Sequence, residues 1–406
     1  MKKNIKLFIS NDFITVLGDG IFTLILMWHV YETTQSALYT AIIGTIGHLT
    51  SFFIGPIAGV IADRSKNPLK LLIKTLHINI ILIVLIVTSI YFLSDIYEAI
   101  SILILIFLRE SIFNLQYPTQ TRLIPKIADT KTISKLIGYR SVTSNIASII
   151  GNSVAGFILA LVGVIGGLMF NSFAFLLGSI VLGFIKITSE STTDNGNTQP
   201  VEYPSIKNDL IEGLKFIWEM KEIRIITIVT CLLNISSMIG PMFVVYFNDF
   251  INAGPTYYGF FNAILAIGSI ISGLLIGNVI KKLSNVSILV YGWLIMGFCL
   301  ISMTFQLDVI FLMLIAFLLG ISLTLPSIIL SSMEIIIVPD HLRGRVSTAI
   351  QSISVSLIPV ANIAGGIIAD IWNVNYVFLI AGIWQLFIVL LVIRYRNLFN
   401  SINITE

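Results

Sequence analysis

The sequence predicts an all-α membrane protein with twelve transmembrane helices arranged in two similar halves. Its 406 residues are 56% hydrophobic and only 11% charged, whereas soluble domains carry about 25% charged residues. A soluble fold of this size would need a polar shell that the composition does not supply. Long apolar runs recur along the chain, and a glycine-rich pattern near residue 55 returns faintly 218 residues later. Together these observations favour a polytopic chain built from a repeat.

Twelve apolar runs are each long enough to cross a bilayer, which takes about 20 residues. Only Ser94 and Asp95 separate the third run from the fourth. Pro118 and Pro326 are expected to end the fourth and tenth helices alike, because proline disrupts a helix interior. The predicted spans are 8–31, 37–62, 69–93, 96–118, 141–162, 166–187, 223–248, 257–280, 286–306, 308–333, 345–369 and 375–393.

The placement of charge predicts the orientation of these spans. With the N-terminus inside, 23 of the 24 Lys and Arg residues fall on the cytoplasmic side, and Arg109 is the exception. The expected outer loops hold acidic residues but no Lys or Arg. This pattern follows the positive-inside rule and predicts a multi-pass plasma-membrane protein with both termini in the cytoplasm. The first run carries Asp12 and Asp19 and lacks a small-residue cleavage site, so no cleavable signal peptide is expected.

The chain is expected to divide into three parts. Residues 1–187 form an N-terminal six-helix bundle, 188–222 a cytoplasmic connection and 223–406 a C-terminal six-helix bundle. Within the connection, 188–204 is polar and rich in Ser, Thr and Asn, which is typical of a flexible linker. After it, apolar residues recur at the spacing of one helix face. That short amphipathic helix lies either along the inner membrane surface or packed under the bundle; its apolar residues are Ile206, Leu210, Leu214 and Ile217.

Four polar residues are expected near mid-depth of the bilayer in the first half of the chain. The corresponding stretches of the second half are uncharged. They are Asp19 in the first helix, His48 in the second, and Arg109 and Glu110 in the fourth. Buried ionisable groups in a membrane are costly, so each is a functional candidate. Asp19 belongs to a polar stripe on the first helix at steps of three and four residues. The fourth helix carries a similar stripe of Glu110, Asn114 and Tyr117.

Arg109 needs a counter-ion, which Asp19 or Glu110 could supply. Adjacent residues on a helix differ in direction by about 100°, so Arg109 and Glu110 need not face the same cavity. A carboxylate in this setting can carry a proton, or the arginine and one carboxylate can form a fixed pair that only orients the bundle. His48 could relay protons, although a hydrogen-bonded packing role is the preferred interpretation. No two histidines show metal-ligand spacing, and no metal site or cofactor is expected.

The stretch from Gly55 to Lys70 contains a compact motif. Gly55, Gly59 and Asp63 share one helix face, and Arg64 follows at the cytoplasmic end. The glycines would let a neighbouring helix approach closely. A carboxylate is disfavoured at a helix C-terminus, so Asp63 is expected to pair with cations on another helix, or to face the N-terminus of one, and to act in gating. The alternative is a charged helix end anchored at the interface. The fainter copy consists of Gly273, Gly277, Lys281 and Lys282.

The motif G-x-x-x-G-x-x-x-D-R-x-K resembles the loop between helices 2 and 3 of the major facilitator superfamily of transporters. Arg109 matches the helix-4 arginine of its drug antiporters. Segments 17–20 (Leu-Gly-Asp-Gly) and 342–346 (Leu-Arg-Gly-Arg-Val) are similar to the branch of macrolide-efflux proteins and enterobactin exporters. The resemblance implies two pseudo-symmetric six-helix bundles rocking around a site lined by helices 1, 4, 7 and 10. The Gly-Pro antiporter signature of helix 5 is absent, which weakens the case for antiport.

We therefore expect a proton-driven exporter of small amphipathic molecules. The alternatives are a siderophore or metallophore exporter that binds a substrate carboxylate through Arg109, and, third, an importer. An intramembrane enzyme is disfavoured because the required catalytic motifs are missing. Expected partners are a small-molecule substrate, protons and the lipid bilayer, with no nucleic acid and a monomeric chain. The residues with which helices 7 and 10 are expected to line the cavity are mostly apolar or mildly polar: Asn234, Ser236, Met238, Tyr246, Phe317, Ser322 and Thr324.

Overall fold

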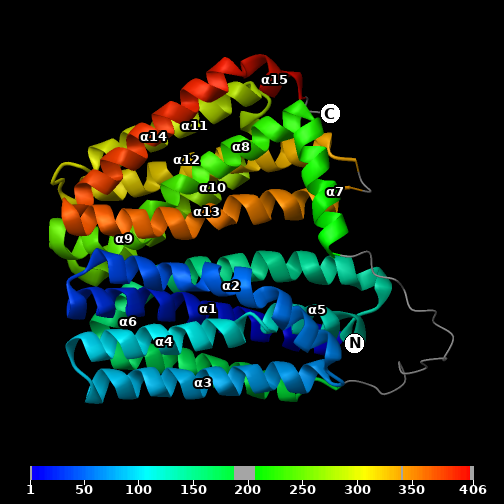
Figure 1. Cartoon of the computed structure of the whole chain (residues 1–406), viewed down its shortest axis with the longest axis vertical. Helices are drawn as coiled ribbons and strands as arrows, with labels where there is room; N and C mark the ends of the chain where they lie inside the picture. The colour runs from blue at the N-terminus through cyan, green and yellow to red at the C-terminus, as the bar shows by residue number, and fades with distance from the viewer. Residues whose placement is uncertain (1, 187–205, 340–341, 403–406) are drawn as a thin grey trace. The chain divides into compact units, whose positions relative to one another are not determined.

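The computed structural model in Figure 1 describes residues 2–186, 206–339 and 342–402 as helices joined by short connections. Its internal contacts divide the chain into two units, Met1–Pro200 and Val201–Glu406. This division falls within 188–222, the segment that the sequence assigns to the connection. The predicted flexible linker, 188–204, lies outside the described residues. The all-α fold class predicted from the sequence is confirmed.

Unit 1 begins with helices whose starts are set by local capping. The side chains of Ser36 and Asn67 each accept a hydrogen bond from a backbone N–H one turn into the following helix, and Pro68 occupies the first turn of the second of these helices. Both arrangements satisfy helix-end donors. The helices of unit 1 are α1 (Lys2–Thr34), α2 (Ala37–Arg64), α3 (Pro68–Phe92), α4 (Asp95–Phe113), α5 (Gln116–Ile127) and α6 (Thr130–Gly183).

Unit 2 contains the remaining helices. The predicted seventh span is divided by a 3-10 turn at Ser236–Met238 and a π turn at Tyr246–Phe250. The α-helices are α7 (Ile206–Glu219), α8 (Lys221–Ile235), α9 (Ile239–Val245), α10 (Gly254–Val279), α11 (Asn285–Ser302), α12 (Val309–Ile337), α13 (Arg343–Ile371), α14 (Val374–Arg394) and α15 (Arg396–Ser401).

In the described parts of the chain, ten helices are long and apolar enough to span a membrane. Two features reconcile this number with the twelve predicted spans. Helix α6 contains Gly163 at φ 68°, a conformation that glycine adopts readily, so α6 is two spans joined at one residue. Helix α4 carries four charged residues among its 19, which keeps it out of these ten. The fold is that of a multi-pass membrane protein, and large apolar side chains such as Leu161, Leu274 and Ile310 are about four-fifths exposed.

The two prolines expected to end helices behave differently. In unit 1 the helix breaks between Phe113 and Gln116. Because Pro118 has no N–H, it cannot bond the carbonyl four residues earlier, that of Asn114, and the break falls there. In unit 2, however, Pro326 lies inside the continuous helix α12, so the prediction that it ends a helix was wrong. Its ring fits against Gly292 of α11, where any Cβ would collide with the proline.

The amphipathic helix α7 packs against the beginning of α13 in its own unit. Ile217 is buried with Val346 and Ile350 of α13. A Cβ at Gly213 would lie 2.6 Å from the carbonyl oxygen of Arg345, so only glycine allows this approach. The guanidinium of Arg345 donates to Glu212 at 2.6 Å. Of the two placements left open by the sequence, the structure shows the helix packed against its bundle.

Candidate functional site

Arg109 of α4 is the centre of a buried ionic cluster in unit 1. Its side chain is fully buried, and its two terminal nitrogens donate separately to Asp19 of α1 and to the neighbouring Glu110. The carboxylates are more accessible, with 26% of the Asp19 side chain and 17% of the Glu110 side chain exposed. The sequence left open which carboxylate would be the counter-ion, and the structure shows that both are.

Aromatic rings enclose the guanidinium. Its carbon lies 4.0 Å from the ring centre of Phe22, 5.7 Å from that of Phe113 and 5.6 Å from that of Phe175. Rings at these distances stabilise a cation through their quadrupoles. The long side chain of Arg109 turns toward Glu110 despite their 100° separation, so the two residues belong to the same site.

A cavity of about 120 Å³ borders the two carboxylates. Asp19, Glu110 and His48 all line it, together with apolar residues of α1, α2 and α4. The structure therefore places His48 beside the cluster, exposed on α2, which differs from the preferred interpretation of a hydrogen-bonded packing residue. Gly47 faces the same space, and a Cβ there would lie 3.5 Å from a Glu110 oxygen.

Asn114 and Tyr117 do not join this cluster. The Asn114 side chain donates to the backbone carbonyl of Glu110 at 2.8 Å and to the hydroxyl of Thr50 at 3.1 Å. Tyr117 lies beyond the helix break, is 70% exposed and sits 5.7 Å from the guanidinium of Arg140. The predicted stripe on the fourth helix is therefore divided by the break.

Arg140 belongs to a second polar cluster that the sequence analysis did not assemble. Its Nε lies 3.3 Å from the buried carboxylate of Asp12, and its guanidinium also donates to Gln120 of α5. Ser144, one turn further along α6, donates to the other oxygen of Asp12. The predicted span began at residue 141, whereas α6 begins at Thr130. An amphipathic pattern in residues 130–140 is the signal that would have predicted a helix containing Arg140.

The motif at the end of α2 has a partner on α5. Arg122 of α5 donates to the carbonyl oxygens of Ala62 and Asp63, and to that of Ser65 at 3.2 Å. It thereby satisfies the carbonyls at the end of α2. Its Nε lies 4.0 Å from the Asp63 carboxylate, whose side chain is 78% exposed. The predicted cationic partner on another helix is thus Arg122, at the limit of ion-pair distance.

The motif glycines are open within their units. A Cβ built at Gly55 or Gly59 meets no described atom within 4 Å. The same holds for Gly273 and Gly277 of α10, the residues of the fainter copy. The two halves therefore share this feature as well as its sequence pattern.

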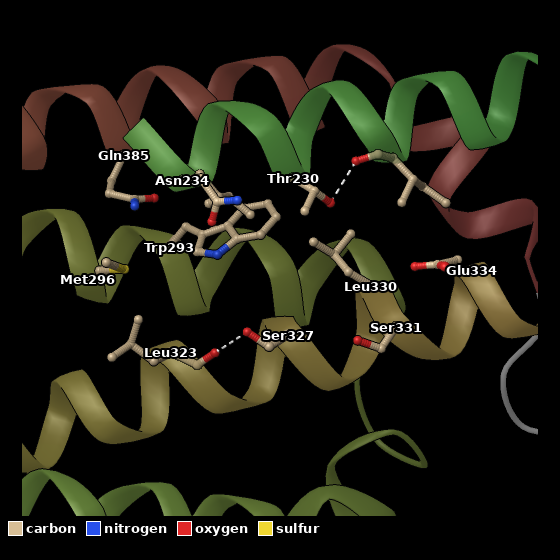
Figure 2. A pocket seen from close by; sticks show the side chains of 12 residues that line it. Thr230, Asn234, Trp293, Met296, Leu323, Ser327, Leu330, Ser331, Glu334 and Gln385 are labelled. Atoms are coloured by element: carbon tan, nitrogen blue, oxygen red, sulfur yellow. Dashed lines mark hydrogen bonds between the residues drawn. The ribbon is translucent and has the colours of Figure 1, made fainter. Parts of the chain in front are cut away.

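Unit 2 holds a larger pocket, of about 270 Å³, with walls from α8, α11, α12 and α14 (Figure 2). Glu334 lines it. The spans of this half were expected to be uncharged at mid-depth, because the predicted tenth span ends at residue 333, one residue before Glu334. The apolar run in fact continues beyond Glu334 to Val338, and this continuation is the sequence signal that the helix includes Glu334. Asn234 lines the pocket as part of the expected lining set, while four others of that set are buried: Ser236, Met238, Tyr246 and Ser322.

The cluster of unit 1 can exist in different charge states without losing its arginine pairing. With both carboxylates ionised, the three groups carry a net charge of −1. One added proton neutralises the cluster and still leaves one carboxylate ionised beside the guanidinium. A buried arginine without a counter-ion would be strongly unfavourable. This arrangement can therefore bind and release one proton at the wall of a cavity.

Comparisons with known proteins agree with these observations. A family described as transmembrane secretion effector matches residues 6–402. The staphyloferrin A transporter of Staphylococcus aureus is 22% identical over 394 residues, covering 93% of this chain and 92% of that protein. Macrolide efflux protein A of Streptococcus pyogenes is 21% identical over 376 residues, covering 91% of this chain and 90% of that protein.

Solved structures show the same fold. The nucleoside transporter NupG superposes with a TM-score of 0.72 at 14% identity, covering 96% of this chain and 99% of that one. A bacterial homologue of the iron transporter ferroportin, in an inward-facing state, also gives a TM-score of 0.72, at 13% identity and covering 97% and 99% of the two chains. The chain is thus a multi-pass membrane transporter for a small molecule and not an enzyme, and it belongs to the transmembrane secretion effector family of the major facilitator superfamily.

Proposed function

We propose that this protein exports small amphipathic molecules in exchange for protons, by alternating access, as a monomer in the plasma membrane with both termini in the cytoplasm. The observation that carries the proposal is the Arg109 cluster bordering a cavity. Proton binding to Asp19 or Glu110 changes the charge of the cavity wall by one unit. Because a guanidinium stays charged inside a protein, the carboxylates are the groups that exchange the proton.

The cycle needs the carboxylates to be ionised in one access state and protonated in the other. Access to water favours the ionised form, and burial favours the protonated form. His48 lines the same cavity and is suited to pass protons between water and the carboxylates. The open glycines of α2, beside Asp63, suit a surface that makes and breaks packing contacts during gating.

Export of a metallophore is the second candidate, supported by the similarity to the staphyloferrin A transporter. In that mechanism Arg109 would bind a carboxylate of the substrate. However, both terminal nitrogens of Arg109 already hold carboxylates of the protein, and the side chain is fully buried. The geometry therefore favours amphipathic substrates that do not require a free arginine.

The test is substrate flux in inverted vesicles with and without an imposed pH gradient. The probes are ethidium, Hoechst 33342 and erythromycin. We expect the single variants Asp19→Asn and Glu110→Gln, each of which leaves Arg109 one carboxylate, to lose uphill transport and to retain downhill exchange, because the remaining carboxylate must stay ionised beside the arginine. The matched controls are Asp308→Asn and Glu219→Gln, each of which removes one carboxylate outside the cluster.

Two results would contradict the proposal. If both single variants still concentrate a probe against its gradient, protons are carried elsewhere. If the wild-type protein concentrates none of the three probes but exports a ferric or iron-free carboxylate siderophore, the metallophore function replaces amphipathic export.

A further inference from the structure

The pocket of unit 2 is lined by oxygen atoms that accept hydrogen bonds. Gln385 of α14 is 1% exposed. Its amide nitrogen donates to Ser236 at 2.9 Å, whereas its oxygen is buried and meets no donor among the described residues. A buried acceptor left without a partner is energetically unfavourable. A ligand that brings an N–H group to this oxygen would remove that cost.

Two hydroxyl groups in the wall also face the pocket as acceptors. Thr230 of α8 donates its proton to the carbonyl of Ile226 at 2.9 Å, and Ser327 of α12 donates to the carbonyl of Leu323 at 2.7 Å. A hydroxyl has one proton and two lone pairs. With their protons used on the backbone, both oxygens have only lone pairs left to offer.

Glu334 supplies the charge. It is the one ionisable residue among the twelve that line the pocket, and within the described ranges no Lys, Arg or His forms an ion pair with it. Ser347 of α13 lies near the carboxylate. A carboxylate can accept about four hydrogen bonds, so capacity remains for a charged donor. In Figure 2, Glu334 lies at one end of the pocket and Gln385 at the other, with Trp293 between them.

We propose that this pocket binds a protonated amine, either as a small molecule or as the amine-bearing end of a larger amphipathic molecule. The ammonium would donate to Glu334, a second N–H or O–H donor to Gln385, and the apolar body would pack on Trp293 and Leu330. A volume of about 270 Å³ is near the lower limit for small-molecule pockets, which is roughly 300 Å³. The identification of this ligand as the transported substrate rests on the proposed function. The binding of an amine in the pocket does not depend on it.

The test is equilibrium binding of tritiated propranolol, a secondary amine with an aromatic body, to the purified full-length protein in detergent. Its uncharged analogue, 3-(1-naphthyloxy)propane-1,2-diol, serves as the competitor that lacks the amine. We expect Glu334→Gln to weaken propranolol binding by about tenfold or more, because a charge-assisted hydrogen bond is lost. Gln385→Met should weaken it by a smaller factor, and Glu334→Asp should bind better than Glu334→Gln. The control Glu219→Gln removes an exposed carboxylate of the same unit and should bind normally.

Several outcomes would overturn this assignment. Equal affinity of the wild-type protein for the amine and for the diol would exclude recognition of charge, and this comparison stands even if a variant fails to fold. Unchanged binding in Glu334→Gln, with binding abolished by Asp19→Asn and Glu110→Gln, would place the amine site in unit 1. Because the assay uses no gradient, its failure is distinct from failure of proton-coupled transport, which the vesicle assay measures.

Discussion

Removing the charge of Arg109 should destabilise the protein more than removing the whole ionic cluster. In Arg109→Met, Asp19 and Glu110 remain close together without a cation. Two hydrogen bonds to charged groups are lost, each worth about 1.5–3 kcal/mol, and breaking a buried pair on one side costs about 3–5 kcal/mol. We therefore expect a loss of about 3–5 kcal/mol. The triple variant Arg109→Met, Asp19→Asn, Glu110→Gln should recover a substantial part of it, since no charge remains unpaired.

The measurement is thermal stability of the detergent-solubilised protein, followed by fluorescence-detected size-exclusion chromatography after heating. The expected order of melting temperatures is wild type first, then the triple variant, then Arg109→Met. Arg109→Lys is the matched control, because lysine keeps the positive charge, although its single ammonium group can pair well with only one of the two carboxylates. If Arg109→Met is as stable as the triple variant, the carboxylates are not held ionised by the arginine, and the charge reasoning behind the coupling proposal fails.

Three further predictions concern other parts of the molecule. Asp63→Asn should insert normally and slow vesicle transport, and unchanged transport would show that Asp63 has no role in gating. Arg122→Ala should slow transport and also lower the melting temperature, because three carbonyls at the end of α2 lose their donor, at a cost of about 1–3 kcal/mol in the free energy of unfolding. Tyr246→Phe should be neutral or stabilising by about 1 kcal/mol, since the buried hydroxyl meets no partner in the described structure, and a clear drop in melting temperature would show that the hydroxyl is used. In a background without native cysteines, Thr34→Cys should react with an impermeant maleimide in intact cells and Lys66→Cys only after permeabilisation, and the reverse pattern would invert the topology.

Composition and apolar runs were sufficient to predict the fold class. The runs encode burial in lipid, which is a local property of each segment. The helix ends were less predictable, because polar residues can extend a helix beyond the membrane. This is why Arg140, expected just before the fifth span, lies inside α6. Glu334 was placed just after the tenth span because the charge itself was taken as the end of an apolar run that continues to Val338.

The candidate residues were predictable, but their contacts were not. A charged residue within an apolar run is visible in one sequence, and Asp19, Arg109 and Glu110 were found that way. Which carboxylate pairs with the arginine depends on a flexible side chain and on two helices far apart in sequence. The position of His48 depends on the space left between helices, which no local pattern encodes. Arg122 could be named only once the end of α2 was seen to lie against α5.

The contrast between the two central prolines gives the halves of the molecule different mechanical properties. The broken helix of unit 1 has two segments, with Arg109 and Glu110 on α4 and Gln120 and Arg122 on α5. Such a joint bends at lower energy than an intact helix, so the ionic cluster and the end of α2 can shift separately. Helix α12 remains continuous through Pro326 and keeps Leu323, before the proline, on the same helix as Ser327 and Glu334 after it. The duplicated architecture thus has a jointed fourth helix in unit 1 and a continuous α12 in unit 2, and we expect any motion that follows from the proposed protonation to bend the jointed helix.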